Sequence, residues 1–235
     1  MPESSDRRAQ RTAAIIVAAG SSQRMKGVDK LLASLRGRPL AGYSIEAFAR
    51  HPAIDELVVV ASDQNLDQVR TIAADIGGDR ATVVPGGRRR RDSVLAGLLA
   101  AGDCDLVVVH DAARPLVDAD MIDAVLDGAR ELGAALCAVP VSDTVKRADP
   151  IGRVSSTVTR EGLWLAQTPQ AFRAGLLRRA HESIDIDVTD DAALIELVGE
   201  PVKLVMGSNR NIKVTLPEDI ALVEALLAAS AGGAD

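Results

Sequence analysis

The sequence predicts an α/β fold in which a mostly parallel, twisted sheet carries helices on both faces. Short runs rich in Val and Ile alternate along the chain with longer stretches of helical periodicity. The runs are apolar throughout, as in 57–61 (Leu-Val-Val-Val-Ala), instead of apolar at every second residue. Continuous apolar strands are typical of parallel sheets, because both faces of such sheets are buried.

Six strands and six helices follow from this alternation. The expected strands are 13–18, 57–61, 82–84, 105–110, 134–139 and 202–206. The expected helices are 39–50, 64–76, 92–101, 119–131, 190–198 and 216–229. The last helix follows Thr215-Leu-Pro-Glu218, which predicts a capping box with proline in the first turn. We expect one domain over 12–230, preceded by a disordered polar tail at 1–11.

One segment, at about 141–161, departs from the alternation. It predicts two short, mostly polar strands around an Asp149-Pro-Ile-Gly152 turn. This hairpin has few apolar residues with which to pack on the core, and isolated two-stranded hairpins are marginal in water. We therefore expect a protruding dimerisation arm ordered by a partner chain, and hence a homodimer. An unpartnered surface loop is the alternative.

Composition excludes several classes of protein. Of the 235 residues, 47% are hydrophobic but only 2% are aromatic, and the formal net charge is −6. The core must be aliphatic, and a general nucleic-acid binder is disfavoured, since stacking aromatics and net positive charge are lacking. Cys104 and Cys137 are too few for a disulfide framework or a zinc site. No apolar run approaches the ~18 residues of a membrane span, and residues 1–11 do not resemble a signal peptide. We expect a cytoplasmic protein without membrane association.

A phosphate-binding loop is predicted after the first strand. The apolar run breaks at Gly20, and the small-residue loop that follows brings in Arg24 and Lys30. Backbone N–H groups and cations at the end of a buried strand suit phosphate groups. The loop is neither a dinucleotide fingerprint nor a P-loop, because Ser22 and Met25 stand where those motifs need glycine. Taken alone, the loop is also compatible with an ordinary strand-to-helix turn.

A second cluster is Gly86-Gly-Arg-Arg-Arg-Arg-Asp-Ser93, which follows the strand at 82–84. Its glycines permit close backbone approach, and Asp92 or Ser93 can cap the next helix. Four consecutive arginines are usually solvated, so we expect most of them to be exposed.

The third cluster is His110-Asp-Ala-Ala-Arg-Pro115, at the end of the most hydrophobic strand. Ligands of open parallel sheets bind beyond the carboxyl ends of the strands, so this cluster is expected near the phosphate loop. The carboxylate of Asp111 is then placed to hold Mg²⁺, which takes few protein carboxylates and several phosphate oxygens. The alternative is that Asp111 caps a turn. We expect His110 to be a packed strand-end residue and not a catalytic base.

As a set, these motifs resemble the 2-C-methyl-D-erythritol 4-phosphate cytidylyltransferase family. The residues that carry the resemblance are Ala18-Ala-Gly20 with Arg24 and Lys30, Asp92-Ser-Val94, His110-Asp-Ala-Ala-Arg-Pro115, Asp143-Thr-Val-Lys146, Leu163-Trp164, Gln167-Thr-Pro-Gln170 and Asn211-Ile-Lys-Val-Thr215. The similarity spans roughly 13–227. It implies a Rossmann-like nucleotidyltransferase that transfers CMP from CTP to a sugar-alcohol phosphate, 2-C-methyl-D-erythritol 4-phosphate. Pyrophosphate and 4-diphosphocytidyl-2-C-methyl-D-erythritol would be the products, in non-mevalonate isoprenoid precursor synthesis.

The resemblance also implies roles for individual residues. Arg24 and Lys30 would stabilise charge at the α-phosphate, Arg160 and Lys213 would position the substrate phosphate, and Asp111 would bind Mg²⁺. The nucleotide would be held by Ala18, Ala19, Gly20, Ser22, Gly87 and Ser93. The substrate pocket, partly across the dimer interface, would contain Arg114, Thr144, Thr168, Thr189 and Asp190.

The chain departs from the family pattern at two places. The stretch from Arg24 to Lys30 is one residue short, so Lys26 is an alternative for the role of Lys30. Arg88 stands where an acidic residue is frequent beside the base, which leaves the reading of cytosine open. Two other functions are weighed against the first. One is CMP transfer to ribitol 5-phosphate, and the other is a catalytically inactive, nucleotide-binding regulatory dimer.

Overall fold

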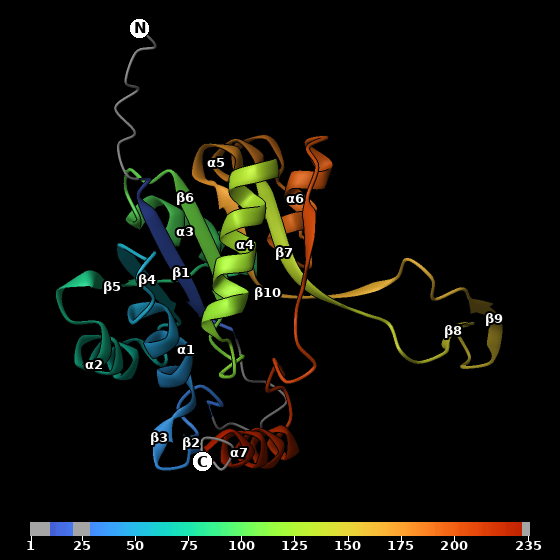
Figure 1. Cartoon of the computed structure of the whole chain (residues 1–235), viewed down its shortest axis with the longest axis horizontal. Coiled ribbons are helices and arrows are strands. Elements are labelled where there is room, and N and C mark those ends of the chain that lie inside the picture. The colour runs from blue at the N-terminus through green and yellow to red at the C-terminus, as the bar shows by residue number, and fades with distance from the viewer. Residues whose placement is uncertain (1–9, 21–28, 232–235) are drawn as a thin grey trace, which may run out of the picture.

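A seven-stranded sheet forms the centre of the molecule (Figure 1). The structure is a computed structural model and describes residues 10–20 and 29–231. The strands run in the order β11-β7-β10-β6-β1-β4-β5. They are β1 (Thr12–Ala18), β4 (Glu56–Ala61), β5 (Ala81–Pro85), β6 (Leu106–Asp111), β7 (Ala134–Pro140), β10 (Trp164–Arg173) and β11 (Lys203–Met206). Only β10 runs antiparallel to its neighbours, β6 and β7. The predicted mostly parallel sheet is confirmed, and each predicted strand is present to within one residue at either end.

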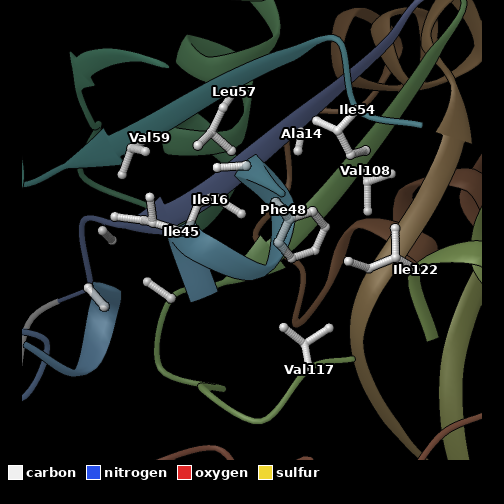
Figure 2. Packing of buried hydrophobic residues seen from close by; sticks show 14 of the residues in the cluster. Ala14, Ile16, Ile45, Phe48, Ile54, Leu57, Val59, Val108, Val117 and Ile122 are labelled. Carbon is white, nitrogen blue, oxygen red and sulfur yellow. The ribbon is translucent and has the colours of Figure 1, made fainter. Parts of the chain in front are cut away.

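Helices cover both faces of the sheet, as predicted. Helices α1 (Leu40–Ala49), α2 (Leu66–Gly77) and α4 (Ala119–Leu132) contribute to one hydrophobic core. Helices α3 (Arg90–Ala100), α5 (Ala174–Ser183) and α6 (Asp191–Leu197) contribute to the other. Within β1, Ala14 and Ile16 face the first core while Ala13 and Ile15 face the second. The continuous apolar runs therefore arise because alternate side chains enter different cores. Figure 2 shows the first core packed around Phe48.

The two longer elements that were not predicted are β10 and α5. Strand β10 contains Pro169 and carries an irregularity in its pairing with β7 between Ala166 and Gln170. Helix α5 begins at Ala174, directly after the strand, so no turn residues separate the two elements. The structure also contains the short strands β2 (Ser34–Leu35) and β3 (Arg38–Pro39) and a 3₁₀ turn at Gly78–Arg80.

Helix α7 (Pro217–Ala231) starts as predicted with proline in its first turn, but a different carboxylate caps it. Asp219 Oδ2 accepts the backbone N–H groups of Thr215 at 2.7 Å and Leu216 at 2.8 Å. The acidic partner of the cap is thus Asp219 and not Glu218. The sequence offers both residues at adjacent positions, and the start of the helix at Pro217 decides between them.

The predicted hairpin arm is present. Strands β8 (Val145–Ala148) and β9 (Val154–Val158) form a separate antiparallel sheet that extends away from the body of the molecule (Figure 1). In its turn, Asp149 Oδ1 accepts the N–H groups of Ile151 at 3.1 Å and Arg153 at 2.8 Å. The arm exposes two aliphatic side chains, Ile151 (74%) and Val154 (64%).

Some predictions fall on residues 1–9 and 21–28, outside the described residues. They concern most of the expected tail and the loop residues Ser22, Arg24 and Lys26. Arg11 is described, and it is held against the domain. Its backbone N–H donates to Asp105 Oδ2 at 2.8 Å, and its guanidinium pairs with Glu56 at 3.1 Å. Including Arg11 in a disordered tail was therefore wrong. In the described ranges, every helix is too short or too polar to cross a membrane.

Candidate active site

A cavity of about 370 Å³ lies at the carboxyl ends of β1, β5 and β6. The lining residues are Val17, Ala19, Gly20, Lys30, Leu31, Gly87, Arg88, Arg89, Arg90, Ser93, Asp111, Ala113 and Lys213. They come from all three polar clusters singled out in the sequence, together with Lys213 from near the C-terminus. The sheet explains this convergence, because its parallel strands β1, β5 and β6 deliver their following loops to one edge.

Gly86 allows the loop after β5 to pack against the end of β1. A Cβ atom at this position would lie 2.5 Å from the Cβ of Ala19 and 2.8 Å from Ser93 Oγ. The next residue, Gly87, donates its N–H to Ser93 Oγ at 3.1 Å. A larger residue at 86 would push this loop away from β1 and open the cavity wall. Ala18 does not line the cavity; it is buried at the end of β1, and its carbonyl accepts from Asn65 Nδ2.

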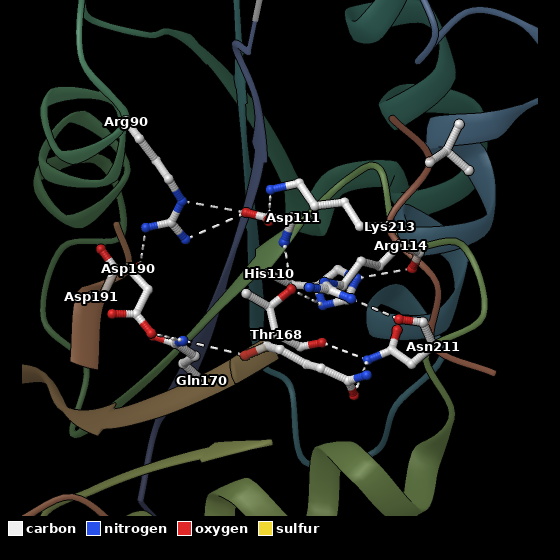
Figure 3. A network of polar contacts seen from close by, with 12 residues as sticks. Arg90, His110, Asp111, Arg114, Thr168, Gln170, Asp190, Asp191, Asn211 and Lys213 are labelled. Atoms are coloured by element: carbon white, nitrogen blue, oxygen red, sulfur yellow. Dashed lines mark hydrogen bonds and ion pairs between the residues drawn. The ribbon is translucent and has the colours of Figure 1, made fainter. Parts of the chain in front are cut away.

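Asp111, at the end of β6, is paired with two cations (Figure 3). Lys213 Nζ donates to Asp111 Oδ2 at 2.6 Å, and the Arg90 guanidinium lies 3.4 Å from Oδ1. Burial alone would raise the pKa of this carboxyl, but Arg90 and Lys213 outweigh that effect and hold the pKa well below its usual range. Asp111 therefore carries a full negative charge at neutral pH.

Arg90 joins Asp111 to a second, fully buried carboxylate. Its Nη1 donates to Asp191 Oδ2 at 2.7 Å, and Asp191 lies at the start of α6 with no exposed surface. Burial raises the pKa of Asp191, and the charge of Arg90 opposes this shift. Arg90 is itself three-quarters buried, so the short contact with Asp191 anchors its guanidinium at the cavity wall.

His110 is a buried strand-end residue, as predicted. Its ring packs against Phe48 with 5.0 Å between ring centroids. Nε2 donates to the carbonyl of Arg114 at 3.1 Å, and Nδ1 accepts from Thr168 Oγ1 at 3.2 Å. Burial lowers the pKa of His110 to about 4. The neutral ring therefore uses both nitrogens within the protein. Thr168 Oγ1 in turn accepts the backbone N–H of Asp111 at 3.0 Å.

The expectation that most of the four arginines are solvated was wrong. Arg91 is only 3% exposed, and its Nη2 donates to the carbonyl of His181 at 3.0 Å. Arg89 pairs with Asp92 at 2.7 Å. The carboxylate of Asp92, which lies in the first turn of α3, also accepts the backbone N–H of Arg89. Among the described residues, Arg88 alone of the four makes no ion pair, and it is exposed. Four adjacent arginines form no pattern that distinguishes the buried side chains from the exposed one. Arg90 was therefore not predicted as a residue of the site.

The residues expected in the substrate pocket do not line the cavity. Arg114 and Thr168 are close to Asp111, and Arg114 Nη1 donates to the carbonyl of Asn211 at 2.7 Å. Asp190 caps α6 by accepting from Ala193 N–H at 3.1 Å, and its other oxygen accepts from Gln170 Nε2. Asp190 is thus the N-cap of α6, and its neighbour Thr189 is exposed.

Thr144 and Arg160 belong to the arm and its base. Both are exposed, and the guanidinium of Arg160 hydrogen-bonds to the carbonyl of Ser142. Within one chain, the structure does not bring them to the cavity. In the described ranges, no three side chains of His, Cys, Asp or Glu gather into a metal-binding cluster. Asp111 is the acidic side chain among the residues that line the cavity.

Comparison with known proteins finds matches over nearly the whole chain. The sequence profile of the family described as 2-C-methyl-D-erythritol 4-phosphate cytidylyltransferase matches residues 12–229. The enzyme of that name from Dehalococcoides mccartyi is 42% identical over 219 residues, covering 93% of this chain and 96% of that protein. Its counterpart from Pelotomaculum thermopropionicum is 45% identical over 230 residues, covering 94% and 96%.

Solved structures show the same fold. The 4-diphosphocytidyl-2C-methyl-D-erythritol synthase of Anaerococcus prevotii superposes with a TM-score of 0.82 at 30% identity, covering 94% of this chain and 100% of that one. The 2-C-methyl-D-erythritol 4-phosphate cytidylyltransferase of Thermus thermophilus gives a TM-score of 0.76 at 33% identity, covering 93% and 100%. The profile match and these relatives cover nearly the whole chain, and the chain belongs to the 2-C-methyl-D-erythritol 4-phosphate cytidylyltransferase family.

Proposed function

We propose that this protein transfers CMP from CTP to 2-C-methyl-D-erythritol 4-phosphate, releasing pyrophosphate, as a step in non-mevalonate isoprenoid precursor synthesis. Membership of the family supports the choice of CTP and 2-C-methyl-D-erythritol 4-phosphate as the substrates. The observation that supports the chemistry is that Lys30 lines the same cavity as Asp111 and the two cations paired with it, Arg90 and Lys213. Five cationic side chains and one carboxylate line the cavity, and Arg89 and Arg90 also pair with carboxylates outside the lining. The remaining excess of positive charge suits a nucleoside triphosphate and a second phosphate ester.

The reaction needs no general base. An oxygen of the acceptor phosphate is already ionised near neutral pH and can attack the α-phosphorus of CTP directly. A new P–O bond forms, the bond from the α-phosphorus to its β-bridging oxygen breaks, and pyrophosphate leaves with that electron pair. Catalysis then rests on in-line positioning and on neutralising the charge that develops. The neutral, fully hydrogen-bonded ring of His110 is consistent with this scheme.

Lys30 and Lys213 are assigned to the two phosphates. Lys30 would stabilise the α-phosphate together with Arg24, which lies outside the described residues. Lys213 would hold the acceptor phosphate with Arg160. The position of Lys30 in the cavity lining supports it for the lysine role, while Lys26 lies outside the described residues.

The remaining assignments follow the resemblance. Backbone groups near Gly20, with Ala18, Ala19 and Ser22, would cradle the triphosphate, while Gly87 and Ser93 would face the cytosine. Gly87 donates to Ser93 Oγ, so both lie on the same cavity wall. The acceptor would contact Arg114, Thr144, Thr168, Thr189 and Asp190.

The residues present fit a magnesium ion held jointly with the nucleotide. Mg²⁺ is usually bound by one or two carboxylates, with substrate phosphates and water completing an octahedron. Asp111 supplies one ionised carboxylate in the cavity lining, and the described residues provide no all-protein cage there. When bound, the ion would neutralise part of the triphosphate charge. Chelation of divalent ions should therefore abolish turnover, and added Mg²⁺ should restore it.

The arm supports a homodimeric assembly. It is a two-stranded sheet apart from the main sheet, with Ile151 and Val154 exposed upon it. A partner chain that covers the arm would bury these side chains. It would also bring Thr144 and Arg160 of one chain close to the cavity of the other chain. A cytoplasmic location is the remaining part of the proposal, and the free thiols of Cys104 and Cys137 are compatible with it.

Pyrophosphate release from CTP tests the proposed function. We expect release with 2-C-methyl-D-erythritol 4-phosphate and Mg²⁺, and little with ribitol 5-phosphate. Turnover with ribitol 5-phosphate only would assign the chain to the related ribitol activity. Binding of CTP without turnover of either acceptor would identify a regulatory, catalytically inactive dimer.

A further inference from the structure

The segment that delivers Lys213 has no regular secondary structure. Residues 207–216 connect β11 to α7 without helix or strand. Even so, Lys213 Nζ lies 2.6 Å from Asp111 Oδ2, and the carbonyl of Val214 accepts from Lys30 Nζ at 3.0 Å. Both lysines therefore depend on where this irregular segment lies. The segment sets the position of the Lys213 backbone, from which the side chain reaches Asp111. It also supplies the Val214 carbonyl to which Lys30 donates.

A buried amide fixes this segment to the sheet. Asn211 has no exposed surface, and its Nδ2 donates to the carbonyl of Thr168 at 2.8 Å and to Gln167 Oε1 at 3.3 Å. The backbone carbonyl of Asn211 accepts from Arg114 at 2.7 Å. Gln167 also bonds Ser208 twice, since its Nε2 donates to the carbonyl at 2.9 Å and its Oε1 accepts the N–H at 3.3 Å.

The irregularity of β10 makes this attachment possible. The pairing of β10 with β7 shifts between Ala166 and Gln170, which takes Gln167 and Thr168 out of the ladder. β-Bulges are common next to active sites, where they change the direction in which a side chain points. Here Thr168 connects Asp111 to Asn211. Its hydroxyl accepts the N–H of Asp111, and its carbonyl accepts the amide of Asn211 (Figure 3).

We propose that Asn211 is a positioning residue for CMP transfer, which fixes Lys213 relative to Asp111 through the bulge at Gln167–Thr168. Asn211 lies two residues before Lys213, and Thr168 contacts both Asn211 and the backbone of Asp111. The acceptor phosphate is thus presented at a fixed distance from the nucleotide site. The same attachment places the carbonyl of Val214 that holds Lys30. This inference rests on the proposed function, because it assigns Asn211 to the geometry of that reaction.

Asn211→Ala tests the proposal by steady-state kinetics. Positioning groups that support a site from behind typically change activity by roughly 10–100-fold. We expect kcat to fall by about that factor, with KM for CTP changed less than about threefold, because Asn211 does not line the cavity. Ser208→Ala is the matched control. It removes the hydroxyl that accepts from Arg210 N–H in the same segment, and kcat should stay near the wild-type value.

A double-mutant cycle with Lys213→Ala separates positioning from general destabilisation. If Asn211 acts through Lys213, Asn211→Ala should cost less than about threefold in kcat once Lys213 is absent. Losses that multiply, or a lowered melting temperature with unchanged kcat, would overturn the proposal. If Asn211→Ala does not fold, Gln167→Met removes one acceptor of the same amide together with both hydrogen bonds to Ser208, and it should show the same coupling to Lys213→Ala.

Wild-type turnover distinguishes the two possible failures. Absence of pyrophosphate release by the wild-type protein contradicts the proposed function. Normal wild-type release with multiplicative losses in the cycle contradicts only the role of Asn211.

Discussion

The ammonium group of Lys213 lies 2.6 Å from Asp111 Oδ2, although the two residues are 102 positions apart in the sequence. Each neutralises the other, and Arg90 contacts the second oxygen of the same carboxylate. A phosphate that binds Lys213 must therefore compete with Asp111, and a cation that binds Asp111 would leave Lys213 available to phosphate. This pair makes the site responsive to both ligands, and it is the contact on which the proposed chemistry most depends.

Lys213→Ala should reduce kcat/KM for 2-C-methyl-D-erythritol 4-phosphate by about 10²–10³-fold, comparable to losing one preorganised transition-state donor. The reason is the loss of a positioned cation for the acceptor phosphate. Steady-state pyrophosphate release measures the effect. Lys203→Ala is a suitable control, because Lys203 pairs with Glu131 and is not among the residues that line the cavity. Equal kcat/KM values for Lys213→Ala and Lys203→Ala would contradict the proposed role of Lys213.

Arg90→Ala should destabilise the fold as well as the site. Its removal leaves the fully buried carboxylate of Asp191 without its cation, and breaking a buried pair typically costs roughly 3–5 kcal/mol. Urea unfolding measures the free energy of unfolding. The exposed pair of Arg70 with Asp67 provides the comparison, where Arg70→Ala should cost at most about 1 kcal/mol. Similar losses in both variants would mean that Arg90 is not an anchored group.

Stability should decline on acidification below neutral pH, partly because of His110. Its pKa is lowered from 6.5 to about 4 in the folded protein, so the unfolded chain binds a proton in this interval that the folded protein does not. Stability is therefore fully present above pH 6.5 and is lost as the pH falls toward 4, by about 3 kcal/mol in total. Unfolding free energies measured across this range give the slope. His110→Gln should lower the slope by about one proton, and an unchanged slope would contradict the buried, neutral histidine.

Charge placed on the arm should disturb the assembly. Ile151 and Val154 are exposed in the single chain, and a partner that buries them cannot accept carboxylates there. Light scattering on the wild-type protein should give twice the chain mass of 24.6 kDa, and Ile151→Asp with Val154→Asp should shift it toward the monomer. Leu99→Asp, at an exposed leucine of α3, is the control and should leave the mass unchanged. A monomeric wild-type protein would contradict the proposed role of the arm.

The central sheet was predictable because its strands carry an unambiguous signal. Strands β1, β4 and β6 are continuous apolar runs, which few other structures explain. Strand β10 was not predicted, because Gln167, Thr168 and Pro169 interrupt its apolar character where it bulges. Its antiparallel direction also lies outside a pattern of alternating strands and helices.

The site was predictable where a residue follows a strand end and less so elsewhere. Asp111 was found because it ends the most hydrophobic strand. Arg90 was hidden within four arginines, and only packing against Asp111 and Asp191 distinguishes it. Asp190 and Asp191 are adjacent acids at the start of α6. Which of them turns inward depends on the position of the helix relative to Arg90, and this is a tertiary relationship.

The central claim is that the site transfers CMP to 2-C-methyl-D-erythritol 4-phosphate. The most direct measurement is a competition, with CTP, Mg²⁺ and equal concentrations of that acceptor and ribitol 5-phosphate in one reaction. Mass spectrometry then identifies the products. The predicted result is 4-diphosphocytidyl-2-C-methyl-D-erythritol as the dominant product, formed with stoichiometric pyrophosphate and lost in Asp111→Asn. Accumulation of the cytidylylated ribitol instead, or of neither product while CTP binds normally, would contradict the account.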